Sequence, residues 1–150
     1  MSGAGEVEVL VNPGDFADAP ERLLESAVRR TLDDQGIIGG EISLTLLDDE
    51  GIGALNHRYL GKDRPTDVLA FSLGDGPAPL GDIYLGVEQA RRQAEELGVA
   101  LEEELVRLAV HGTLHVLGYD HPDGAERTGS PMFVLQERLV HLVLAGASGV

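Results

Sequence analysis

The stretch His111-Gly112-Thr113-Leu114-His115-Val116-Leu117-Gly118-Tyr119-Asp120-His121 holds three of the five histidines of the chain. His111 and His115 are four residues apart, so on a helix they lie on one face, one turn from each other. Gly118 stands where a helix can end in left-handed geometry, after which the chain can bring His121 toward the other two. Three converging imidazoles predict a catalytic site for zinc, nickel or another divalent metal, with one position open to water. The chain has no cysteine, which excludes a closed thiolate site.

The residue after the first histidine argues against a peptidase. Zinc peptidases of the H-E-x-x-H type carry a glutamate there, which acts as general base for the metal-bound water. Gly112 occupies this position and has no side chain to accept a proton. The sequence therefore disfavours a metallopeptidase.

The whole run resembles the signature H-G-x-L-H-x-x-G-Y-D-H of the YbeY family, which are bacterial metal-dependent endoribonucleases of ribosome maturation. The resemblance extends from about residue 41 to about residue 140. It includes Leu55-Asn56, residues 61–69, Gly81-Asp82-Ile83, residues 91–94, and Met132 with Gln136-Glu137.

This resemblance implies a specific function. The chain would be a single-strand-specific endoribonuclease with one Zn²⁺ per chain, held by His111, His115 and His121. It would act in maturation of the 3′ end of 16S rRNA and in ribosome quality control. Its partners would be single-stranded RNA and the small ribosomal subunit, and no DNA is expected.

The chain departs from the family pattern at two places. Leu60 stands where family members commonly carry an arginine regarded as important for activity, and Arg58 or Arg64 could contact a phosphate in its place. After Leu69 the chain has Ala70-Phe71-Ser72, whereas the family usually has Ser-Phe-Pro. The first change concerns catalytic rate or RNA preference, and the second only the end of a strand.

The net charge opposes binding of a polyanion. With 26 acidic and 11 basic residues the chain carries a formal charge of −15, whereas nucleic-acid binding draws affinity from Lys and Arg at phosphates. Two basic groups, residues 58–64 and Arg91-Arg92, could serve a local RNA site or be plain solvated surface. A bound divalent cation would add local positive charge. We expect weak, salt-sensitive RNA binding by the isolated protein.

Length and composition predict one domain spanning residues 1–150, since 43% of the residues are hydrophobic. No stretch approaches the roughly 20 apolar residues that span a membrane. The N-terminus lacks the basic and apolar regions of a secretory signal. We expect no membrane association and a cytoplasmic protein.

Periodicity predicts an α+β fold, a four-stranded mixed sheet packed with helices. Strands are expected at residues 7–11, 42–46, 66–73 and 82–85, the last antiparallel to the third. A helix should begin near Asp18, with Pro20 in its first turn, and end at Gly36. Further helices are expected after Asp48-Asp49 up to Gly61, at residues 87–97 and 101–117, and from Ser130-Pro131 onward.

Two carboxylates are further site candidates. Asp120 lies beside His121 and can orient a ligand imidazole, cap the turn after Gly118, or do both. Asp67 opens the predicted central strand, where the resemblance places it near the metal and a plain strand-start hydrogen bond is equally compatible. The expected reaction is metal-assisted phosphodiester hydrolysis, with Asp120, Asp67 or the phosphate itself as proton acceptor. Water or the 2′-hydroxyl of RNA could be the nucleophile.

A different class of function is also compatible with the sequence. The protein could be mainly a ribosome-assembly factor with a structural metal site and little free nuclease activity. The charge of −15 and Leu60 favour this alternative over an efficient free nuclease.

Overall fold

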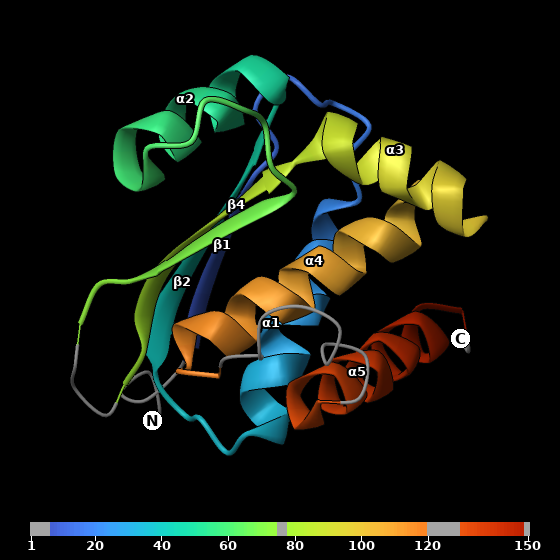
Figure 1. Cartoon of the computed structure of the whole chain (residues 1–150). Coiled ribbons are helices and arrows are strands. Elements are labelled where there is room, and N and C mark those ends of the chain that lie inside the picture. The colour runs from blue at the N-terminus through green and yellow to red at the C-terminus, as the bar shows by residue number, and fades with distance from the viewer. Residues whose placement is uncertain (1–6, 75–77, 120–129, 149–150) are drawn as a thin grey trace.

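The fold was taken from a computed structural model, which describes residues 7–74, 78–119 and 130–148. The elements in chain order, labelled in Figure 1, are β1 (Val7–Asn12), α1 (Glu21–Asp34), β2 (Gly40–Leu47), α2 (Asp49–Leu60), β3 (Val68–Ser72), β4 (Leu80–Gly86), α3 (Val87–Leu97), α4 (Leu101–Val116) and α5 (Pro131–Ser148). The predicted helices and strands are therefore confirmed in number and order over the described residues.

The four strands form one mixed sheet in the order β1-β2-β4-β3. β2 pairs in parallel with both β1 and β4, whereas β3 pairs antiparallel to β4, with Phe71 opposite Asp82. The predicted antiparallel pairing is confirmed. Because β3 lies at the end of this order, one of its edges has no neighbouring strand within the sheet.

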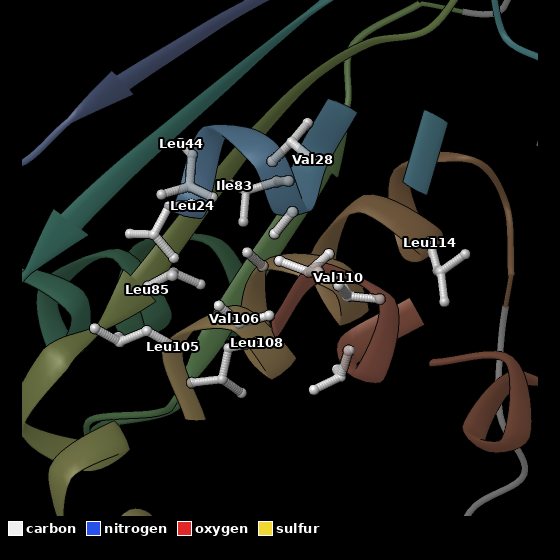
Figure 2. Packing of buried hydrophobic residues seen from close by; sticks show 14 of the residues in the cluster. Leu24, Val28, Leu44, Ile83, Leu85, Leu105, Val106, Leu108, Val110 and Leu114 are labelled. Atoms are coloured by element: carbon white, nitrogen blue, oxygen red, sulfur yellow. The ribbon is translucent and has the colours of Figure 1, made fainter. Parts of the chain in front are cut away.

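Alternation along the strands directs one face of the sheet into the hydrophobic core. Ile83 and Leu85 of β4 are fully buried, as are Leu24 of α1 and Leu105 and Leu114 of α4. Figure 2 shows these side chains meeting between the sheet and the helices. α4 lies between the sheet and α5, while α2 packs at one end of the opposite face (Figure 1).

Two glycines let α4 approach the sheet closely. A Cβ at Gly112 would lie 2.8 Å from Cγ2 of Ile83 and 3.3 Å from Cγ2 of Val68. A Cβ at Gly81 of β4 would lie 2.6 Å from Cγ1 of Val116. The contacts of 2.8 Å and 2.6 Å are shorter than real Cβ atoms show, so a side chain at either position would push α4 away from the sheet.

The predicted start of the first helix is wrong. α1 begins at Glu21 rather than near Asp18, and Pro20 precedes the helix instead of lying in its first turn. Proline disfavours helical geometry in the residue before it, so Ala19 cannot join the helix. Ala19 instead closes a turn, in which its N–H donates to the carbonyl of Phe16 at 3.0 Å.

The predicted third strand is too long at both ends, because β3 covers only Val68–Ser72 of the expected residues 66–73. Thr66 and Asp67 lie just before the strand. Among the described helices, none combines the length and the apolar character needed to cross a bilayer.

Candidate functional site

The first two histidines of the motif lie side by side at the end of α4. Nε2 of His111 is 2.9 Å from Nε2 of His115, and the two rings meet edge to face with centroids 4.5 Å apart. Gly118 ends the helix with φ of 100°, and the N–H groups of Gly118 and Tyr119 donate to the carbonyls of His115 and Leu114. This is the left-handed helix end that the sequence predicts. His121 and Asp120 lie outside the described residues.

A glutamine from α5 fixes the orientation of His111. Oε1 of Gln136 is 2.6 Å from Nδ1 of His111, and Gln136 is only 6% exposed. The amide of Gln136 donates in turn to Oε2 of Glu137 at 3.0 Å, which directs its carbonyl oxygen to the imidazole. An oxygen acceptor at Nδ1 requires a proton there, so Nε2 of His111 carries the lone pair. In the neutral imidazole this lone pair faces Nε2 of His115 at 2.9 Å, and it is the one through which His111 can bind a metal.

The carboxylate of Glu137 belongs to a cluster around Arg107 of α4. The guanidinium of Arg107 pairs with Glu103 at 3.0 Å, Glu104 at 2.9 Å and Glu137 at 2.8 Å. Burial raises the pKa of Glu104, and the hydrogen bond from Arg107 offsets only part of this effect. Burial also acts to raise the pKa of Glu137, but its hydrogen bonds from Arg107 and Gln136 outweigh burial and lower it. Arg107 is thus neutralised by its own carboxylates.

A cleft of about 1220 Å³ opens beside the two histidines, with β3 along one wall. Asp67 lines this cleft, and its Oδ2 accepts a hydrogen bond of 3.1 Å from Nε2 of Gln93 on α3. The backbone of Asp67 is held by the N–H of Gly86, which donates to its carbonyl at 2.8 Å. A Cβ on Gly86 would collide with the carbonyl oxygen of Thr66. The close approach that glycine permits therefore sets the position of Asp67.

The basic residues that could contact a phosphate differ in whether they line the cleft. Leu60 and Lys62 both line the cleft, so the position of the missing family arginine does face it. Arg58 does not belong to the described lining, and its guanidinium lies 5.5 Å from the ring centroid of Tyr59. Arg92 pairs with Asp49 at 2.9 Å on the surface, as the plain-surface interpretation predicts.

Sequence reasoning did not identify the polar residues that support the site. The sequence points to Gln136 and Glu137 only through the family resemblance, and it gives no role to Gln93 or Arg107. His111 and Gln136 are 25 residues apart, and Asp67 and Gln93 are 26 apart. No local periodicity connects residues at such separations, so only the packed helices reveal these contacts.

The described residues fit part of a metal site. They contain no group of three or more His, Cys, Asp or Glu side chains able to hold an ion, and two of the three predicted ligands lie among them. Nitrogens bound to one tetrahedral zinc ion at about 2.0–2.1 Å are about 3.3 Å apart. The 2.9 Å between the imidazoles of His111 and His115 is close to that separation. The pair fits two adjacent ligand positions with a small outward movement.

Comparison with known proteins gives a consistent result. The family profile described as Endoribonuclease YbeY matches residues 9–143. A protein named Endoribonuclease YbeY from Persephonella marina is 40% identical over 79% of this chain and 80% of its own. Another from Sulfurihydrogenibium sp. is 38% identical over 87% and 89%. The solution structure of TM1509 from Thermotoga maritima superposes with a TM-score of 0.65 at 28% identity, covering 95% and 92% of the two chains. A profile match over most of the length, relatives of this identity and a shared fold lead to one conclusion: the chain belongs to the YbeY endoribonuclease family.

Proposed function

We propose that this protein is a metal-dependent endoribonuclease that hydrolyses phosphodiester bonds of single-stranded RNA. The observation that carries the proposal is the pair His111 and His115 beside a cleft, with His111 oriented by Gln136. The names of the relatives support RNA as the substrate. Within that class we propose the 3′ region of 16S rRNA and the small ribosomal subunit as partners, which implies a cytoplasmic location.

We assign the metal to His111, His115 and His121, one ion per chain, with zinc as the first candidate and nickel as another. Once bound, such an ion would lower the pKa of water and polarise a phosphoryl oxygen. Gln136 keeps the proton of His111 on Nδ1 and leaves Nε2 for coordination. The donor set of neutral imidazoles suits zinc and nickel better than magnesium or calcium, which prefer oxygen ligands.

Asp67 is the described carboxylate that we assign as proton acceptor. It lines the cleft with the histidines, and Gln93 holds its Oδ2 so that the carboxylate keeps one orientation. Asp120 remains an alternative acceptor beside His121. Lys62 lines the cleft and is better placed than Arg58 to contact the scissile phosphate. The two possible nucleophiles, water and the 2′-hydroxyl of RNA, leave different product ends. A 2′,3′-cyclic phosphate indicates attack by the 2′-hydroxyl, and a 5′-phosphate with a 3′-hydroxyl indicates attack by water.

The close approach at Gly112 bears on the peptidase alternative. A glutamate there, as in H-E-x-x-H peptidases, would collide with Ile83 and Val68. The helix therefore has no room for that general base, which agrees with an RNA substrate. A ribosome-assembly factor with little nuclease activity is the second candidate, favoured by the charge of −15 and by the neutralisation of Arg107.

Cleavage of a labelled single-stranded RNA by zinc-loaded protein tests the proposal. His115→Ala should abolish cleavage with the fold intact by circular dichroism, while His141→Ala should cleave like wild type, because His141 is exposed on α5. Equal cleavage by wild type and His115→Ala would indicate a contaminating nuclease and contradict the assignment. If wild type does not cleave RNA, the assembly-factor function is favoured. Cleavage of casein by wild type would instead support the metallopeptidase alternative.

A further inference from the structure

The face of the sheet turned away from α4 carries a row of aromatic rings. Phe71 of β3 lies between Tyr59, with ring centroids 5.3 Å apart, and Tyr84 of β4, at 6.1 Å. The row holds three of the six aromatic residues of the chain, which has three Tyr, three Phe and no Trp. Tyr59 is 55% exposed, and Phe71 and Tyr84 are half-buried. Contiguous aromatic side chains that stay partly exposed to solvent are typical of a surface that binds a ligand or partner.

Three cationic side chains come from the end of α2 and the loop after it, where the one carboxylate among residues 58–64, Asp63, pairs with His57 at 2.8 Å. Arg58, Lys62 and Arg64 are exposed, and no carboxylate lies within ion-pair distance of them in the part of the chain that the structure describes. The guanidinium of Arg58 lies over the ring of Tyr59. In an acidic protein, such a group of unpaired cations beside exposed rings is complementary to a nucleic-acid strand, which offers phosphates and flat bases together.

Phe71 connects the row to the cleft beside the histidines, because it is the one ring of the three that belongs to the described lining. Residues 66–71 all line the cleft, although their side chains alternate between the two faces of the sheet. The cleft therefore follows the free edge of β3 and includes Phe71 on the far side. Leu60, next to Tyr59 in sequence, and Lys62, three positions after it, line it as well. A flexible strand can pass from the histidines around this edge to the rings.

We propose that Tyr59, Phe71 and Tyr84 form a stacking subsite for unpaired bases of single-stranded RNA, adjacent to the scissile phosphate. Arg58 and Lys62 hold the backbone beside the rings. The subsite rests on the proposed function for its choice of RNA as ligand. Glu8 of β1 and Glu41 of β2, farther along the same face, repel phosphates and confine the RNA backbone to the end of the sheet formed by β3 and β4. Asp82, opposite Phe71, repels phosphates from the rings themselves, so that bases and not the backbone contact them. A base can stack on these rings only when it is not held in a duplex, so the subsite selects single strands.

The test is the affinity for a fluorescein-labelled single-stranded adenine RNA of about twelve nucleotides. Fluorescence anisotropy in EDTA gives Kd, with a gel to show that the RNA stays intact. Tyr59→Leu should weaken binding about 5- to 20-fold, the low end for loss of one stacked base. Tyr59→Phe should bind like wild type. With an abasic RNA of equal length, wild type and Tyr59→Leu should bind alike, since no base remains to stack.

Leu10→Ser is the matched control. Leu10 is 68% exposed on β1 of the same sheet face but lies away from the rings, so its loss should leave Kd unchanged. Equal RNA affinity of wild type and Tyr59→Leu, both folded by circular dichroism, would overturn the subsite. A change in oligomeric state on Tyr59→Leu without a change in Kd would also overturn it, and would assign the face to a second copy of the chain.

The same variants separate the subsite from the proposed function. If wild type cleaves RNA and Tyr59→Leu binds it equally well, the nuclease stands and the subsite fails. If neither protein cleaves RNA but binding depends on Tyr59 and on the bases, the subsite stands and the nuclease fails.

Discussion

Replacing Gln136 with leucine should weaken zinc binding although Gln136 is not a ligand. The substitution keeps a side chain of similar size at a site that is 6% exposed, and removes the 2.6 Å hydrogen bond to Nδ1 of His111. Loss of such a supporting acceptor typically costs 10- to 100-fold in metal affinity, or about 1.4–2.7 kcal/mol. The short bond and the buried location place this effect in the upper half of that range. Without the acceptor, His111 is free to rotate or to move its proton to Nε2.

Competition with a chromophoric chelator at about pH 7 gives the zinc Kd of each variant. Gln89→Leu is the matched control, because Gln89 on α3 bonds only to Arg92 among the described residues and lies outside the described lining of the cleft. It should bind zinc like wild type. Circular dichroism confirms that both variants fold.

An unchanged zinc Kd for folded Gln136→Leu would show that His111 is oriented without Gln136, and the assigned tautomer would lose its basis. Equal weakening in Gln89→Leu would indicate a general loss of stability instead of an effect on the ligand. Wild-type protein that binds no zinc or nickel at one ion per chain would contradict the metal assignment itself.

Three further predictions concern stability and are checked by urea unfolding. Gly112→Ala should cost about 1–3 kcal/mol, because the new Cβ would lie 2.8 Å from Ile83; an unchanged midpoint would mean that α4 can move off the sheet freely. Arg107→Met should cost about 3 kcal/mol at neutral pH by leaving three carboxylates without their cation, and a stabilised variant would contradict this. Arg138→Met should cost less than about 1 kcal/mol, because the side chain of Arg138 is 52% exposed. The hydrogen bond from Arg138 lowers the pKa of Asp34 below 3.8. The ion pair therefore stabilises the fold above pH 3.8, and this stabilisation is lost as the pH falls through the pKa of Asp34 in the folded protein. A difference between wild type and Arg138→Met that persists at the lowest pH of the folded protein would contradict the assignment.

The local features of this protein follow from its sequence. The spacing of His111 and His115 places both on one face of a helix, and Gly118 ends that helix in left-handed geometry, as the structure confirms. Alternating hydrophobic residues identify β1 and β2, an apolar run identifies β3, and the antiparallel pairing of β3 with β4 follows from their short connection. These features depend on residues a few positions apart, for which helix and strand periods set the geometry. The start of α1 was predicted wrongly because the proline effect on Ala19 competes with the helical pattern.

The contacts that make a site from these elements come from tertiary structure alone. The sheet order β1-β2-β4-β3 leaves β3 at the edge, which forms the cleft wall and carries Phe71 toward Tyr59. Packing of α5 on α4 supplies Gln136 to His111, and the sequence motif shows a glycine at 112 without showing that no side chain fits there. A histidine pair four residues apart is set by the 3.6-residue period of one helix. The tautomer of His111 and the carboxylate that lines the same cleft depend on which distant elements pack together, because burial and close packing act between surfaces and not along the chain.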